Sequence, residues 1–412
     1  NQINMHIIEY CILLKYHFIY IYKLMNKNLN FKKGFHSIHS DVKIDDKLEY
    51  VLGRLDYIIE KREKFNLSNS ENKIIDKIIE SYKRLVNKDP LEIDHMILED
   101  FEILELKKIS NQNLNRYLIY RYKYNIYPKI QHVDDYPPCV QIEPSSICNF
   151  RCTMCFHIDE SFSGKKNGYM GLMPMDIFKK TIDELEGNVE AVTFASRGEP
   201  TVNKSFGEML RYSEGKFLAL KMNTNASMLD EKLIHSILSS DLQTVVFSVD
   251  ARNKLEYEQI RVNGKFEKIE RNIELFNEIR NKHYSRDDKI VRISGVKIND
   301  KQDVDQMKDK WGNLVDSVAF VNFIPWNASY LNSDSPNNIN TPCPELWLRM
   351  FVWYDGKVNP CDYDYKSLLS KWNINENSIK EIWSSKEYSE YRNLHMNNKR
   401  NTLDPCKGCV SQ

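Results

Sequence analysis

The sequence predicts an α/β fold whose centre is an open barrel of parallel strands, a partial (β/α)6 arrangement like part of a TIM barrel. Three observations lead to this prediction. Apolar segments of strand length alternate with segments of helical periodicity, and polar motifs follow the strand segments. The regions before and after these segments lack this alternation. We expect a helical region before the barrel and a small, loop-rich domain after it.

The alternation of strands and helices is the main support for the barrel. Strands that alternate with helices form parallel sheets with right-handed crossovers. Six such units are too few for the closed eight-stranded barrel, so we expect an open one. The expected strands are 139–143, 191–196, 217–223, 244–249, 290–296 and 317–324, and the expected helices are 174–186, 204–213, 230–239, 266–281 and 302–314.

The chain divides into four regions. Residues 1–44 form an N-terminal extension, which we interpret as a misassigned start, with Met5 and Met25 as alternative starts. A membrane anchor is the alternative interpretation, and Glu9 and Lys15 argue against it because they interrupt the apolar stretch. Residues 45–138 have helical periodicity and no catalytic motif. Residues 139–335 contain the barrel. Residues 336–412 follow a linker-like stretch and hold the last four cysteines.

Composition argues against some classes of function. The chain has 412 residues, and its 58 lysines and arginines balance 58 aspartates and glutamates, so no overall field attracts nucleic acid. Of nine cysteines, seven fall into two groups with metal-ligand spacing, while Cys11 and Cys139 are left over. We expect Cys139 to be a packed thiol, and a hydrogen donor to a substrate radical is the alternative. We therefore expect a cytoplasmic protein with metal sites, no nucleic-acid partner and no membrane span.

Three cysteines follow the first expected strand on one short loop. Cys148, Cys152 and Cys155 have the spacing Cys-x3-Cys-x2-Cys. Three thiolates can hold three irons of a [4Fe–4S] cluster and leave the fourth iron open to another ligand. A zinc site completed by His157 is the alternative interpretation.

Polar groups also follow the next three strands. Gly198-Glu199-Pro200 follows the second strand, Asn223-Thr224-Asn225 ends the third, and Ser248-Val249-Asp250 ends the fourth. The carboxyl ends of parallel strands meet at one rim, which is where barrels of this kind have their active sites. The position of these groups therefore predicts an enzyme.

Taken together, these motifs resemble the radical S-adenosylmethionine (radical SAM) enzymes over residues 139–325. The resemblance implies that Cys148, Cys152 and Cys155 hold a [4Fe–4S] cluster whose open iron binds SAM. No catalytic residue beyond the cluster is implied. Arg197 stands where many members have glycine, and Met154 where many have an aromatic residue. The implied cofactor-binding residues are Gly198, Glu199, Pro200, Asn223, Asn225, Ser248, Asp250 and Arg261.

The later cysteines have the order Cys … Gly-x4-Cys … Cys-x2-Cys, formed by Cys343, Cys361, Cys406 and Cys409. This order, with the segment 373–383, resembles the SPASM extension of radical SAM enzymes. The resemblance implies an auxiliary [4Fe–4S] cluster closed by four cysteines, which serves electron transfer or structure. A structural zinc site is the alternative. We expect the segment 362–365 to face the substrate.

The sequence thus predicts a radical SAM oxidoreductase or modifying enzyme. Reductive cleavage of SAM would supply a radical that abstracts hydrogen from a small-molecule substrate, such as a sugar derivative, or from a peptide. The auxiliary cluster would transfer electrons, and a flavodoxin or ferredoxin is the expected electron donor. The alternative is a non-catalytic zinc-binding scaffold.

Overall fold

The structure is a computed structural model, and it describes residues 36–39, 47–286, 288–299, 302–326, 328–331, 339 and 341–410. The expectations for the alternative starts, for Cys11 and for the linker at 332–338 lie outside the described residues.

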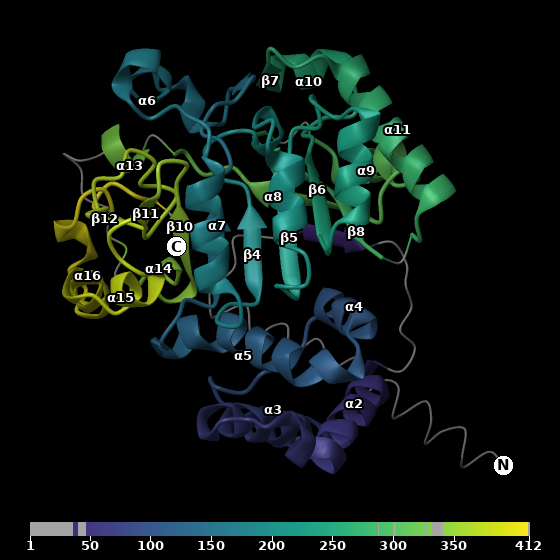
Figure 1. Ribbon diagram of the computed structural model, residues 1–412, viewed down its shortest axis with the longest axis vertical. Helices are drawn as coiled ribbons and strands as arrows, with labels where there is room; N and C mark the ends of the chain where they lie inside the picture. The colour runs from purple at the N-terminus through teal and green to yellow at the C-terminus, as the bar shows by residue number, and fades with distance from the viewer. Residues whose placement is uncertain are drawn as a thin grey trace.

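A sheet of ten strands forms the centre of the described part of the chain (Figure 1). Its strand order is β1-β9-β8-β6-β5-β4-β2-β10-β11-β12, and all neighbours from β9 to β10 run parallel. The strands are β1 His36–His39, β2 Cys139–Ile142, β4 Ala191–Phe194, β5 Ala219–Thr224, β6 Thr244–Ser248, β8 Ile290–Lys297, β9 Ser317–Asn322, β10 Arg349–Val352, β11 Lys357–Asn359 and β12 Trp372–Asn373. Two short strands, β3 Arg151–Cys152 and β7 Arg261–Val262, pair with each other.

Helices cover the outer face of the parallel strands (Figure 1). Leu220 and Met222 of β5 are fully buried in one apolar core with helix residues such as Met209 and Ile234. These helices are α7 Met175–Leu185, α8 Phe206–Tyr212, α9 Glu231–Ser239, α11 Phe266–His283 and α12 Val304–Trp311, while α10 Lys254–Ile260 lies beyond the ends of the strands, next to β7. The prediction of a partial barrel is confirmed, and every expected strand and helix lies within a few residues of an observed one.

The helical region lies at the amino ends of the strands (Figure 1). Its helices are α2 Lys47–Lys61, α3 Asn69–Asn87, α4 Asp100–Lys108 and α5 Leu114–Ile130. Their apolar core also contains Cys139 and Ala191, the first residues of β2 and β4. Cys139 is 4% exposed, and burial raises the pKa of its thiol, as expected for a packed cysteine. The helical region therefore closes the amino end of the barrel.

The C-terminal region extends the sheet. Strand β10 pairs in parallel with β2, so that Arg349 lies opposite Cys139 and Val352 opposite Ile142. Strands β11 and β12 then add antiparallel. The helices of this region are α14 Glu345–Leu348, α15 Ile379–Trp383 and α16 Lys386–Met396, and the short helix α13 Ala328–Leu331 precedes it. The strand pairing fixes the second cysteine group relative to the barrel.

Candidate active site

The first cysteine loop leaves the carboxyl end of β2 and lies against the segment that follows β4. A Cβ atom at Gly198 would lie 2.3 Å from the Ser145 backbone oxygen and 2.7 Å from that of Ile147, so only glycine permits this contact. The Glu199 amide donates to the Ile147 oxygen at 3.0 Å, and buried Pro200 begins a short turn. The Gly-Glu-Pro segment therefore supports the cysteine loop through its backbone.

The Glu199 carboxylate connects three segments at the rim. It accepts hydrogen bonds from Thr201 Oγ1 at 2.5 Å, Thr224 Oγ1 at 2.6 Å and the Asn225 amide at 2.7 Å. The side chain is deeply buried, and burial raises its pKa while these donors oppose the rise. Because protein donors occupy its oxygens, Glu199 positions Asn225; its direct contact with a cofactor stays a prediction.

Asn225 extends this network to the first cysteine. Its Nδ2 donates to Asn149 Oδ1 at 3.0 Å and lies 3.9 Å from Cys148 Sγ. Its Oδ1 accepts hydrogen bonds from the amide and the hydroxyl of Ser227. Glu199 and Asn225 thus form a chain of contacts that ends at the Cys148 thiol.

A second chain of contacts ends at Cys152. Arg261 forms a buried ion pair with Asp250, and its Nη1 lies 3.8 Å from Cys152 Sγ. The other Asp250 oxygen accepts the Val296 amide at 2.7 Å. Pairing of β3 with β7 places Cys152 opposite Arg261. A guanidinium beside a cysteine stabilises its thiolate form.

Asn223 and Ser248 lie on the inner face of the sheet, away from the helices. Both keep some solvent-accessible surface, unlike the buried residues on either side of them. The Asn223 Oδ1 atom is buried and has no hydrogen-bond partner among the described residues. The structure therefore brings all the expected cofactor-binding residues to one rim, and it leaves the Asn223 oxygen available to a ligand.

The thiols of the first loop suit a metal cluster. Burial raises the pKa of the Cys148 and Cys155 thiols to about 12. The Phe150 amide donates to Cys148 Sγ at 3.4 Å, in addition to the side-chain donors described above. A bound cluster would stabilise the thiolates that burial disfavours, so the donor set fits one. His157, the alternative zinc ligand, is buried with Nε2 at 2.6 Å from the Arg197 backbone oxygen.

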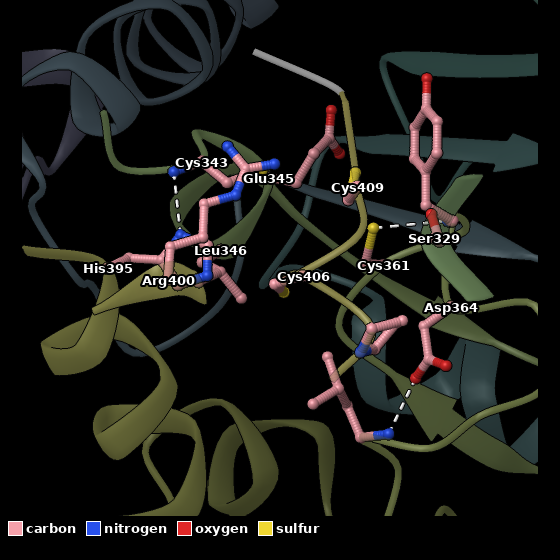
Figure 2. A pocket seen from close by; sticks show the side chains of 13 residues that line it. Ser329, Cys343, Glu345, Leu346, Cys361, Asp364, His395, Arg400, Cys406 and Cys409 are labelled. Atoms are coloured by element: carbon pink, nitrogen blue, oxygen red, sulfur yellow. Dashed lines mark hydrogen bonds between the residues drawn. The ribbon is translucent and has the colours of Figure 1, made fainter. Parts of the chain in front are cut away.

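Four cysteines from three segments of the chain line a second site (Figure 2). The Tyr363 amide donates to Cys361 Sγ at 3.4 Å, and the Cys343 amide donates to His395 Nδ1 at 3.1 Å. Burial raises the pKa of the Cys343 thiol to about 11. Four cysteine thiols are the donor set of a closed iron–sulfur cluster and equally of a structural zinc ion, while no three of the described His, Cys, Asp or Glu side chains are already spaced as ligands of one metal ion. The cysteines that line this cavity are Cys343, Cys361, Cys406 and Cys409.

Comparison with known families distinguishes between an iron–sulfur cluster and a zinc ion. Residues 142–309 match the sequence profile of the radical SAM superfamily, and residues 343–410 match that of SPASM, an iron–sulfur cluster-binding domain. The chain belongs to the radical SAM superfamily. It is a radical SAM enzyme, and membership implies a [4Fe–4S] cluster with SAM in the first domain and auxiliary cluster binding in the SPASM domain.

Relatives of this radical SAM enzyme include a tungsten-containing aldehyde ferredoxin oxidoreductase cofactor-modifying protein from Pyrococcus furiosus. It is 24% identical over 307 residues, which are 62% of this chain and 83% of the relative. The mycofactocin maturase MftC of Mycolicibacterium smegmatis is 28% identical, over 34% of this chain and 34% of its own length. The crystal structure of Streptococcus suis SuiB bound to the precursor peptide SuiA has a TM-score of 0.51 at 15% identity, with 88% and 90% of the two chains covered, and it supports the fold.

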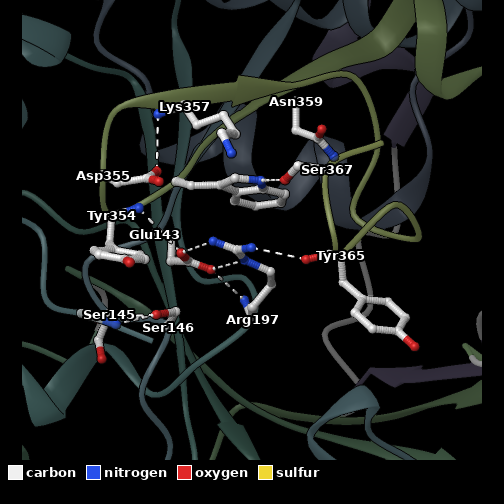
Figure 3. Close-up of polar contacts among 12 residues, drawn as sticks. Glu143, Ser145, Ser146, Arg197, Tyr354, Asp355, Lys357, Asn359, Tyr365 and Ser367 are labelled. Carbon is white, nitrogen blue, oxygen red and sulfur yellow. Dashed lines mark hydrogen bonds and ion pairs between the residues drawn. The ribbon is translucent and has the colours of Figure 1, made fainter. Parts of the chain in front are cut away.

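Arg197, which departs from the family pattern, connects the radical SAM domain to the SPASM domain (Figure 3). Its Nε and Nη2 both lie 2.7 Å from Glu143 oxygens, and its Nη1 donates to the Tyr365 backbone oxygen at 3.0 Å. The guanidinium lies 4.1 Å from the Trp353 ring centroid. Both charged residues are almost completely buried. Sequence reasoning noted Arg197 as unusual but missed the ion pair, because Glu143 has no motif of its own.

Aromatic rings form a second connection between the two cysteine loops. Phe156, next to Cys155, stacks on Tyr365 with ring centroids 5.0 Å apart and meets Trp326 edge-on at 5.2 Å. Trp326 stacks on Tyr363 at 4.3 Å. The helix α6 Glu160–Ser163 adds Phe162 to this cluster.

The expectation that the segment 362–365 faces the substrate is wrong for Tyr363, Asp364 and Tyr365. All three side chains are buried. Asp364 accepts hydrogen bonds from the Tyr330 hydroxyl at 2.6 Å and from the Leu368 and Leu369 amides. These residues hold the SPASM loop in place.

Within the described residues, no helix combines the length and the apolar composition that a membrane crossing requires.

Proposed function

We propose that this radical SAM enzyme is an oxidoreductase that modifies a carbon centre of a small polar molecule, such as a sugar derivative, or of a peptide. In this proposal the auxiliary cluster of the SPASM domain transfers electrons, and a flavodoxin or ferredoxin is the electron donor. One observation carries the proposal. The Cys148 loop lies at the same rim as the inward-facing Asn223 and Ser248, so a molecule inside the barrel would lie next to the cofactor site.

When bound, the cluster and SAM supply one-electron chemistry, while the protein positions the reactants and excludes water. Glu199 and Asn225 hold the loop at Cys148, and Asp250 holds Arg261 against Cys152. The helical region closes the amino end of the barrel, so we place substrate entry at the cysteine-bearing rim.

The substrate class is supported by the lining of the barrel and by the relatives. Thr193, Asn223 and Ser294 give the inner face a polar character that suits a hydrophilic substrate. The relatives are named as a cofactor-modifying protein and as a mycofactocin maturase, and one structural neighbour is bound to a precursor peptide. Both small molecules and peptides are therefore reasonable substrate classes.

The decisive experiment is anaerobic. Reconstituted enzyme should contain iron and sulfide at both cysteine sites and should form 5′-deoxyadenosine from SAM after reduction. Deuterium should pass into that product from a deuterated substrate. The Cys148→Ala variant should form no deoxyadenosine, whereas Cys139→Ala, which removes a packed thiol, should form it. Protein that binds zinc at both sites and cleaves no SAM under these conditions would instead be the scaffold alternative.

A further inference from the structure

His395 is a buried histidine that lines the cavity of the four SPASM cysteines (Figure 2). It lies in the last turn of α16, and the residue is 1% exposed. Arg392, one turn earlier, fixes this helix by donating to the backbone oxygens of Leu346 at 3.0 Å and Trp383 at 2.8 Å. The imidazole therefore has a defined position beside Cys343, one of the expected cluster ligands.

A backbone hydrogen bond determines which nitrogen of His395 carries the proton. The Cys343 amide donates to Nδ1 at 3.1 Å, so Nδ1 must present its lone pair. An imidazole with an unprotonated Nδ1 is neutral and carries its proton on Nε2. Nε2 is therefore a hydrogen-bond donor, and it cannot be a metal ligand while the bond to the Cys343 amide is present. This arrangement leaves ligation to the four cysteines.

The Nε2 donor has no acceptor within the described part of the protein. The atom is buried, and none of the described residues is its hydrogen-bond partner. The Ser329 hydroxyl lines the same cavity and is also buried without a partner among these residues. Buried polar atoms are almost always hydrogen-bonded, and truly empty cavities are apolar. The two atoms indicate that a polar group completes the cavity, and the sulfur atoms of an iron–sulfur cluster accept hydrogen bonds.

We infer that His395 positions and tunes the auxiliary cluster by donating an Nε2–H hydrogen bond to a sulfur atom, either of the cluster core or of a cysteine ligand. Hydrogen bonds to these sulfur atoms are one of the factors that set the reduction potential of iron–sulfur clusters. Reduction adds negative charge, so a donor stabilises the reduced cluster more than the oxidised cluster and raises the potential. The inference depends on the cluster that SPASM membership implies, and it holds whether or not this cluster exchanges electrons with the substrate.

Two substitutions separate the roles of the two nitrogens. Asparagine places its side-chain oxygen near the position of Nδ1, so His395→Asn keeps an acceptor for the Cys343 amide and removes the second donor. Glutamine reaches the position of Nε2, so His395→Gln keeps that donor and removes the first acceptor. A redox titration of the fully reconstituted enzyme, followed by EPR, measures the potential of each cluster. SAM identifies the signal of the first cluster, because it binds only the open iron.

We expect His395→Asn to lower the auxiliary potential and His395→Gln to retain most of the wild-type value. Loss of one hydrogen bond to a charged group should reduce the equilibrium constant for cluster reduction about tenfold, which corresponds to about 59 mV for a one-electron couple. The potential of the first cluster should not change in either variant.

His95 of the helical region provides the matched control. Its Nδ1 accepts the Glu92 amide at 2.6 Å, as that of His395 accepts the Cys343 amide, but His95 does not line the cysteine cavity. His95→Asn should therefore leave both potentials unchanged.

Iron and sulfide content, with circular dichroism, report whether each variant holds both clusters. A wild-type auxiliary potential in His395→Asn would overturn the inference, since the histidine would then only hold the Cys343 backbone. Loss of auxiliary iron from His395→Gln but not from His395→Asn would overturn it for the same reason. A large nitrogen coupling in pulsed EPR spectra of the reduced auxiliary cluster would reveal a histidine ligand and would also contradict it. Enzyme that shows the expected potentials but cleaves no SAM would contradict the proposed function and leave this inference intact.

Discussion

The two cysteine centres of this enzyme are built in opposite ways. Cys148, Cys152 and Cys155 lie on one loop, and side chains from other strands, Asn225 and Arg261, reach their sulfur atoms. The four cysteines of the SPASM domain come from three separate segments, those of Cys343, Cys361 and the Cys406–Cys409 pair, and these segments meet only when the C-terminal region folds. The ligands of the first centre are thus close together in the sequence, and side chains of the barrel contact their sulfur atoms. The ligands of the second centre are brought together by the tertiary structure. The difference implies that the two centres can be lost separately.

The largest expected effect tests this separation. Cys152→Ala should remove the cluster of the first centre and reduce deoxyadenosine formation to background, because three thiolates are the minimum that holds an open-iron cluster. Cys361→Ala should remove the auxiliary cluster but leave deoxyadenosine formation from SAM in place. Iron content and Mössbauer spectra distinguish the two clusters. If Cys361→Ala also abolished SAM cleavage, the two centres would be one cooperative unit and the comparison would fail.

A smaller effect is expected at the Glu143–Arg197 ion pair, whose guanidinium also contacts the SPASM domain. Arg197→Met leaves Glu143 buried without its partner, which should cost about 3–5 kcal/mol of unfolding free energy. Because Arg197 also donates to the Tyr365 backbone, the auxiliary cluster should be lost at lower urea concentration than the first cluster. Cluster absorbance and circular dichroism during urea unfolding measure both events.

The double variant Glu143→Met with Arg197→Met is the control for this pair. Replacing both charges with apolar side chains of similar volume should recover much of the lost stability, since no buried charge is left unpaired. Equal destabilisation in the single and double variants would show that Arg197 acts through Trp353 and Tyr365 and not through Glu143.

Removal of the Glu199 charge should have an intermediate effect, confined to the first centre. Glu199→Gln replaces one acceptor oxygen with a donor, so at least one of the Thr201, Thr224 and Asn225 hydrogen bonds is lost. We expect a loss of about 1–3 kcal/mol in unfolding free energy. SAM affinity and the stability of the first cluster should fall while the auxiliary cluster is retained. Equilibrium unfolding and SAM titration of the reconstituted variant check this expectation.

The difference between the centres also explains what the sequence could predict. The Cys148 loop and the Gly198 segment could be predicted because their residues are close together in the sequence and because they follow strand ends. Hydrophobic periodicity indicates where those strands end. The barrel strands were predictable for the same reason. The Glu143–Arg197 pair and the Phe156–Tyr365 stack join residues that are far apart in the chain. No periodic pattern links such residues, because the parallel pairing of β2 with β4 brings Glu143 to Arg197 and that of β10 with β2 brings the SPASM domain to the first cysteine loop.

The smallest expected effect concerns a contact that joins the two centres at the surface. Asp159, just after the first cysteine loop, accepts the Tyr365 hydroxyl at 2.8 Å and the Lys366 ammonium at 2.7 Å. Burial alone would raise the pKa of Asp159, but hydrogen bonds from Lys366, Ser161 and Tyr365 lower it to about 2. The folded pKa therefore lies below that of an unfolded aspartate, about 3.9, so the ionised carboxylate stabilises the fold.

Asp159→Asn should cost about 1 kcal/mol at neutral pH, a value reduced from the full pKa shift because the side chain is partly exposed to solvent. The difference in unfolding free energy between wild type and variant should have its full value above about pH 4. It should disappear as the pH falls towards 2, where the native carboxylate becomes protonated. Urea unfolding at several pH values measures it. A cycle with Lys366→Met separates the ion pair from the Tyr365 hydrogen bond. If the difference were independent of pH, the carboxylate charge would contribute nothing, and the rings and the Arg197 pair alone would connect the two centres.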